Sequence, residues 1–209
     1  IAVGDVFITE LHRQPRFGGT SSVANGVWLE LYNGSNRSID LSGWYFLRTS
    51  TVGTDAFHLD PADGVIIDPG TFVVLCKTDT YAFGTDPSSL LACDYIWGDA
   101  SQPSSYSEYY HDNTWNPQRD TDDLQIWYGG DSTTGILMDH VAYDWTTNSN
   151  WPRDATQSMS LDPAAFDATS NDDVGSWCST LNDSAYVWYD NGGSGIEYGT
   201  PGAANYDCP

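Results

Sequence analysis

Carboxylates are the commonest side chains in this chain that could do chemistry, and one cluster of them stands out. Asp120, Asp122 and Asp123 fall within four positions, and Asp112 precedes them in the same loop-like stretch. Oxygen-rich loops suit calcium, a hard cation that takes about 6–8 oxygen ligands, so calcium is the cofactor that this cluster favours. The EF-hand spacing is absent, however, and 25 Asp residues make chance clusters inevitable. Solvated loop charge is therefore the simpler interpretation.

Aromatic side chains form a second group with chemical potential. Tyr95, Trp97, Tyr109 and Trp115 lie within residues 78–123, a long stretch with a weak strand pattern. If these rings are exposed, they could stack on sugars and make the chain a glycan-binding module. If they are buried, they form a small second core that holds the stretch in place. We favour the buried alternative, because a long loop must bury apolar surface to stay ordered.

The usual catalytic patterns are missing from the sequence. It contains no Gly-x-Ser-x-Gly motif, and with 29 acidic residues any two could be named as a glycosidase pair. The four histidines fall in unrelated strand or loop settings: His12, His58, His111 and His140. We therefore expect a protein without enzymatic activity.

The charge balance excludes one class of partner. The formal net charge is -22, and the 7 basic residues include a single lysine, Lys77. Nucleic-acid binding needs clustered Lys and Arg to contact phosphates, so we expect no nucleic-acid partner. The apolar runs are also too short to cross a bilayer, so we expect no membrane span. An acidic surface poor in lysine suits a salty or calcium-rich exterior.

The chain has four cysteines, Cys76, Cys93, Cys178 and Cys208, and no Cys-x-x-Cys motif. Disulfides are therefore a better interpretation than metal ligation. Of the three possible pairings we predict the sequential one. Cys76–Cys93 would tie the long stretch to a strand, and Cys178–Cys208 would hold the chain end, which otherwise tends to fray. Disulfides predict an oxidising compartment, so we expect an extracellular or cell-surface location.

The elements that must position these groups are short strands. Apolar and polar residues alternate with period 2 over several short windows, and turn signals such as Asn33-Gly34 separate them. Sustained helical periodicity is absent. The expected strands cover residues 6–9, 27–32, 44–48, 65–67, 72–76, 124–128, 136–143 and 159–161. Many short strands with frequent turns predict an all-β sandwich or barrel.

Several motifs, taken in order, make the chain similar to a known family. They are an opening strand V-F-I-T-E-L, then W-L-E-L-Y-N, D-L-S-G-W, D-P-G followed by a strand, D-L-Q-I, and a closing T-P-G-A-A-N at residues 200–205. This order resembles the lamin tail domain family, in its bacterial, secreted or cell-surface form. The resemblance implies an immunoglobulin-like β-sandwich. Residues 1–209 would form one such domain, enlarged by insertions at about 78–123 and 163–199.

The motif residues are best interpreted as scaffold. Trp28 and Trp44 are large enough to span the space between two sheets. Glu10 and Glu30 fall on adjacent strands of the expected sandwich, where they could pair around a cation or an arginine. We favour the plainer alternative, two solvated strand carboxylates.

Three classes of function stay open. The one we favour is a non-enzymatic extracellular interaction or structural module, one domain of a larger secreted or cell-surface protein with a protein or cell-surface partner. The second is a carbohydrate-binding module that uses the insertion aromatics. The third, which the resemblance suggests because bacterial relatives travel with secreted enzymes, is an accessory domain of a hydrolase or nuclease. Exposed insertion rings would favour the second class, and a cleft with converging carboxylates of raised pKa the third.

Overall fold

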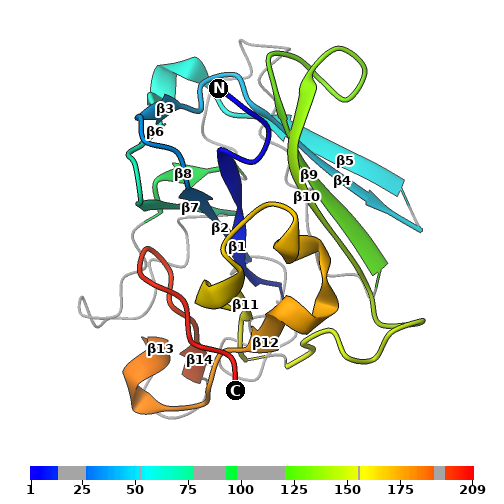
Figure 1. Ribbon diagram of the computed structural model, residues 1–209, viewed down its shortest axis with the longest axis vertical. Helices are drawn as coiled ribbons and strands as arrows, with labels where there is room; N and C mark the ends of the chain where they lie inside the picture. The colour runs from blue at the N-terminus through cyan, green and yellow to red at the C-terminus, as the bar shows by residue number, and fades with distance from the viewer. Residues whose placement is uncertain (14–26, 52, 78–92, 98–120, 155, 191–195) are drawn as a thin grey trace.

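The fold is an immunoglobulin-like β-sandwich, seen in a computed structural model that describes residues 1–13, 27–51, 53–77, 93–97, 121–154, 156–190 and 196–209. A six-stranded sheet has the order β12-β11-β1-β2-β7-β8, and a four-stranded sheet has the order β10-β9-β4-β5 (Figure 1). The all-β prediction is confirmed. Within these residues, no helix is long and apolar enough to cross a membrane.

The six-stranded sheet is antiparallel except at one edge, where β7 and β8 run parallel. Its strands are β1 (Val6–His12), β2 (Trp28–Asn33), β7 (Phe72–Cys76), β8 (Tyr95–Ile96), β11 (Met159–Leu161) and β12 (Trp177–Ser179).

The four-stranded sheet is antiparallel throughout. Its strands are β4 (Tyr45–Ser50), β5 (Gly53–His58), β9 (Thr121–Tyr128) and β10 (Ile136–Asp144). Two small antiparallel pairs join β3 (Ile39–Asp40) to β6 (Ile66–Ile67) and β13 (Val187–Asp190) to β14 (Ile196–Tyr198). The described helical elements are single 3₁₀ turns: η2 (Pro61–Asp63), η4 (Pro163–Ala165), η5 (Ser170–Asp172), η6 (Val174–Ser176) and η7 (Ser184–Tyr186).

The main core lies between the two large sheets and follows from the alternation of each strand. Leu29 and Leu31 of β2 belong to the same buried cluster as Leu124 and Ile126 of β9. Successive strand residues point to opposite faces, so one apolar residue in two is enough to fill this layer. Trp44 is also part of this cluster and is fully buried, as predicted.

Trp28, in contrast, does not lie between the sheets. It belongs to a second buried cluster with Val74, Cys76 and Trp188 on the outer face of the six-stranded sheet. The expectation that Trp28 spans the sandwich is therefore wrong. The reason is the register of β2, in which Trp28 shares its face with Glu30, while Leu29 points into the main core.

Strand β1 is buried on both faces, which is unusual for an antiparallel sheet of a two-layer protein. Its pairing with β2 shifts register between Ile8 and Glu10, a β-bulge that leaves Thr9 as the extra residue. One face of β1 points into the main core. On the other face, Phe7 packs against the rings of Tyr32 and Phe166, and Glu10 is covered by the end of the chain, residues 196–208, which we call the C-terminal strap. The strap, red in Figure 1, lies on the side of the six-stranded sheet away from the four-stranded one.

Candidate functional site

Two carboxylates lie under the C-terminal strap. Glu10 of β1 and Glu30 of β2 are direct cross-strand partners, and both are 0% exposed. The interpretation of these residues as solvated strand carboxylates is therefore wrong. Their own strands allow exposure, but the strap, which follows them by more than 160 residues, excludes water from this face.

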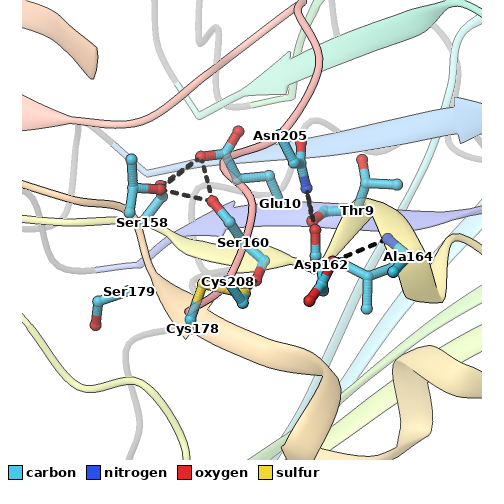
Figure 2. The surroundings of a disulfide bond; sticks show 12 residues. Thr9, Glu10, Ser158, Ser160, Asp162, Ala164, Cys178, Ser179, Asn205 and Cys208 are labelled. Atoms are coloured by element: carbon cyan, nitrogen blue, oxygen red, sulfur yellow. Dashed lines mark hydrogen bonds between the residues drawn. A yellow bond between two sulfur atoms is a disulfide. The ribbon is translucent and has the colours of Figure 1, made fainter. Parts of the chain in front are cut away.

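Hydroxyl and amide groups surround both carboxylates. Ser158, Ser160 and Thr180 donate their hydroxyls to Oε1 of Glu10, as Figure 2 shows for the two serines. From the strap, Thr200 donates its hydroxyl to Oε2 of Glu10 at 2.8 Å and its N–H to Oε1 at 3.0 Å.

Glu30 and the bulge residue Thr9 complete the set of hydrogen bonds that fastens the strap, which we call the latch. Thr9 donates its hydroxyl to Glu30 at 2.7 Å, and the N–H of Gly202 donates to the same carboxylate at 2.7 Å. Asn205 donates Nδ2 to the carbonyls of Thr9 and Leu161 at 2.7 and 3.0 Å, the first of which is drawn in Figure 2. The T-P-G-A-A-N motif therefore closes the domain by supplying donors to buried acceptors.

Burial raises the pKa of Glu10, although the surrounding hydroxyls and amides oppose the change. The pKa of Glu30 is raised well above its usual range, first by burial and then by repulsion from Glu10 and Asp94. A buried pair held by donors on every side is suited to fastening the strap, and its chemistry is structural.

Two disulfides hold the same region together, in the sequential pairing expected from the sequence. Cys178 is bonded to Cys208 with a Cα–Cα distance of 5.7 Å, and Cys76 is bonded to Cys93 with a distance of 5.8 Å. The first fixes the far end of the strap to β12 (Figure 2). The second lies beside Trp28 in the outer cluster.

The candidate calcium ligands do not converge where the structure describes them. Asp122 is buried and lies 3.2 Å from Arg48 Nη1, and it accepts the hydroxyl of Tyr143 at 3.0 Å. Asp123 points to the opposite face of β9, where it accepts Nε2 of Gln125 at 2.7 Å. The two carboxylates therefore cannot share one cation.

The other two candidate ligands, Asp112 and Asp120, lie outside the described residues. In the part of the chain that the structure describes, no group of three or more His, Cys, Asp or Glu could hold a metal ion. Calcium binding by the stretch around these residues stays a prediction.

Of the four insertion aromatics, too, two lie within the described residues and two lie outside them. Tyr95 is 4% exposed and Trp97 0%, and the ring of Trp97 stacks on Phe57 at 5.5 Å between centroids. These two rings are buried, so the proposal that they bind a glycan is wrong for them. They belong to the main core, however, and not to a small second core of their own. Tyr109 and Trp115 lie outside the described residues.

The structure brings together a different set of rings on the outer face of the four-stranded sheet. His58, Tyr45 and Trp127 are cross-strand neighbours on β5, β4 and β9, and Leu137 of β10 continues the row. All four are partly exposed, and the rings of Tyr45 and His58 are 4.7 Å apart. We call this surface, together with the polar residues beside it, the aromatic face.

A chain of polar contacts runs along the strands from this row. The indole N–H of Trp127 donates to Gln125 at 3.0 Å, and Gln125 donates to Asp123. His140 of β10 lies 3.4 Å from Asp123 through Nδ1 and 3.5 Å from Asp172 through Nε2. The side chains of Asp123 and His140 are 33% and 40% exposed, although Oδ1 of Asp123, the oxygen nearest to His140, is buried.

A pocket of about 320 Å³ adjoins the aromatic face at the β10 edge. Leu137 and His140 belong to both, so the pocket and the row form a continuous surface. Its other walls come from the N-terminal segment and the loop before η5: Val3, Gly4, Met138, Asp139, Asp167, Ala168 and Thr169. A pocket of this volume lies at the low end of the range of small-molecule sites, roughly 300–1,000 Å³.

Asp139 stands behind this pocket and joins the two sheets. Its Oδ2 accepts the N–H of Ile8 in β1 at 2.7 Å and Nδ2 of Asn171 in η5 at 2.8 Å. Burial is the main reason that its pKa is raised to about 8. Sequence reasoning missed both Asp139 and the aromatic face. The alternation of Asp123, Gln125 and Trp127 along one strand was the available signal for the latter.

Comparison with known proteins gives two findings. The family model described as Lamin Tail Domain matches residues 1–144. The crystal structure of a DUF4876 family protein from Bacteroides thetaiotaomicron is similar at 10% identity with a TM-score of 0.41, and the similarity covers 78% of this chain and 63% of that chain. No curated protein matches the chain.

Proposed function

The chain belongs to the lamin tail domain family, and from this we propose that it is a non-catalytic binding module of a larger extracellular protein. The family's immunoglobulin-like fold is a scaffold that presents surfaces, and it supports a module of this general kind. The features specific to this chain, its disulfides and its aromatic face, support the extracellular location and the binding role.

The pair of disulfides is the observation that carries the extracellular assignment. Cys178–Cys208 holds the end of the strap that supplies Thr200 and Gly202 to the buried carboxylates. Cytosolic thiol systems keep cysteines reduced, whereas secreted proteins retain such bonds. A domain whose last segment depends on a cystine is therefore suited to an oxidising exterior.

The aromatic face supports the binding role. Partly exposed rings on three adjacent strands, with a pocket at the end of the row, offer a rigid surface whose side chains lose little entropy on contact. The alternative is an ordinary solvated sheet face, in which cross-strand pairs of this kind only stabilise the sheet. The partner that we propose is a protein or another component of a cell surface.

Surface digestion of the cells that make this protein tests the proposal. A protease added to intact cells should degrade the chain while a cytosolic marker survives. Mass spectrometry after alkylation without reduction should find all four cysteines in the pairs Cys76–Cys93 and Cys178–Cys208. A chain that survives digestion and carries alkylated thiols would contradict the extracellular role.

A further inference from the structure

We infer that the aromatic face and its pocket bind a neutral glycan. The rings of Trp127 and Tyr45 would stack on the apolar faces of sugar rings, and Gln125, Asp123 and His140 would bond the sugar hydroxyls. This inference rests on the proposed function, since it names the partner class of that same binding face.

The arrangement of the rings is the first step of the argument. Tyr45 pairs with His58 on one side and with Trp127 on the other, so the three rings follow one line across three strands. Neighbouring strands are spaced by about 4.8 Å, so the three residues form a strip in which the rings of Tyr45 and His58 are in contact, 4.7 Å between centroids, and Trp127 follows on the next strand. Sugar rings carry C–H groups on their faces, and an extended strip of aromatic rings is a complementary surface for several of them in a row.

The polar chain beside the rings is the second step. Trp127, Gln125 and Asp123 are linked by hydrogen bonds of 3.0 and 2.7 Å, which hold their side chains in place before any ligand arrives. Gln125 keeps a second N–H and Oδ2 of Asp123 keeps a further lone pair, whereas Oδ1 of Asp123 is buried. Sugar hydroxyls both donate and accept, so a fixed mixture of donors and acceptors suits them. Such preorganisation lowers the entropic cost of binding.

Electrostatics excludes an anionic ligand. Asp123 and Asp172 flank His140, and the whole chain carries a net charge of -22, which repels uronic acids and sulfated sugars. A basic peptide is the competing occupant. The nearby carboxylates of Asp131 and Asp144 are already bound by the hydroxyls and N–H groups of their own turns. These hydrogen bonds lower the pKa of Asp131 and Asp144 and keep both ionised. The row of rings and the uncharged amide of Gln125 favour a neutral sugar over a cation, and nona-arginine is the comparison that tests this choice.

The pocket extends the strip at the β10 edge. Leu137 continues the row of rings, and His140 lies at the end of the polar chain; both line the pocket. A sugar chain that follows the strip is led to this pocket, where Thr169 and Asp167 supply more oxygen atoms. We expect the pocket to take the end of the chain or a branch.

Titration calorimetry with defined neutral oligosaccharides tests the inference. The probes are cellohexaose, xylohexaose, laminarihexaose and mannohexaose, with hexagalacturonate and nona-arginine as the anionic and cationic comparisons. We expect at least one neutral hexasaccharide to bind. W127A and Y45A should each weaken that binding about tenfold or more, because each removes one stacking surface. Q125A should weaken it as well.

Two further variants keep the test decisive. Y206A is the matched control. Tyr206 lies in the strap, its ring packs against that of Tyr186 in η7 at 5.1 Å between centroids, and the variant should bind like the wild type. W127F retains a ring on the sheet and should bind between the wild type and W127A, which guards against a folding defect. Circular dichroism and the thermal midpoint check that every variant is folded.

Several results would overturn the inference. They are no binding of any neutral hexasaccharide, binding that W127A and Y45A leave unchanged, and binding of nona-arginine alone. None of these would touch the extracellular assignment, which the digestion and cystine measurements test independently.

Discussion

Replacing Asp139 with Asn should weaken the pH dependence of folding, because the native protein holds this carboxyl in its protonated form at neutral pH. Its Oδ2 accepts the N–H of Ile8 and Nδ2 of Asn171, and burial raises its pKa to about 8. An unfolded chain returns the group to its ordinary pKa of 3.8. Asn has the shape of the protonated acid and keeps an oxygen for the same two donors, so D139N removes the titration and keeps these two contacts.

The direction of the pH effect on stability follows from which state, native or unfolded, binds the proton of Asp139 more tightly. Below the ordinary pKa of 3.8 Asp139 is protonated in both states, and the native state is then most favoured. As the pH rises toward about 8 the native state holds one proton more, so the free energy of unfolding falls by about 1.36 kcal/mol for each pH unit. From about pH 5 to about pH 7 this amounts to about 2.7 kcal/mol, with a ceiling near 6 kcal/mol over the whole window.

Glu10 and Glu30 add to the same trend. Burial raises the pKa of both, so their contribution to stability also declines as the pH rises through their native values. The wild type should therefore be more stable in mildly acidic than in alkaline solution, and D139N should keep only the part caused by the other carboxyls of raised pKa, namely the two glutamates, Asp94 and Asp172.

Urea unfolding of the oxidised protein at several pH values, followed by tryptophan fluorescence, measures this effect. The matched control is D183N. Asp183 is an exposed residue that caps η7 by accepting the N–H of Ala185, and Asn caps equally well. The control should show the wild-type slope, whereas D139N should lose about 2.7 kcal/mol of the change between about pH 5 and about pH 7. A D139N slope equal to that of the wild type would refute the reasoning.

Three other outcomes follow from the structure. Reducing Cys178–Cys208, or replacing both residues with Ser, should cost about 3 kcal/mol, and hydrogen exchange should rise first in the strap rather than in β9. N205A should cost about 1–3 kcal/mol in urea unfolding, because the buried carbonyls of Thr9 and Leu161 lose a donor; a neutral effect would contradict the latch. A gel shift at physiological salt should find no DNA binding, given the net charge of -22, and a salt-sensitive micromolar complex would overturn that expectation.

Local patterns in the sequence were enough to predict most strands and both disulfides. The strand expected at residues 72–76 is β7, Phe72–Cys76, because its apolar run and the turn before it are short-range features. The cystines join cysteines that are neighbours in the sequence, so pairing by order along the chain succeeded. Strand β5 was missed because G-T-D-A-F-H has no clear apolar alternation.

The calcium candidates show where a local pattern misled. The strand was expected to begin at residue 124, which left Asp122 and Asp123 in a loop, but β9 begins at Thr121. Asp122 occupies a core-facing position of that strand. Because it is polar, a search for apolar periodicity does not recognise the position as part of the strand. Its buried charge is offset by Arg48, 74 positions away, a partner that no window of the sequence contains.

Burial was decided by segments that meet only in the folded chain. Glu10 and Glu30 follow an ordinary strand pattern, yet the strap seals them because Thr200 folds back across 190 positions to Glu10. The aromatic face arises in the same way, since Tyr45 meets Trp127 only when β4 pairs with β9. The order of the motifs and the spacing of the cysteines are properties of the chain itself, and they determined the sandwich and its cross-links. Which carboxylates are shielded from water and which rings share a surface depends on contacts between residues distant in the sequence. These contacts form, and stabilise the protein, only when the sheets pack together.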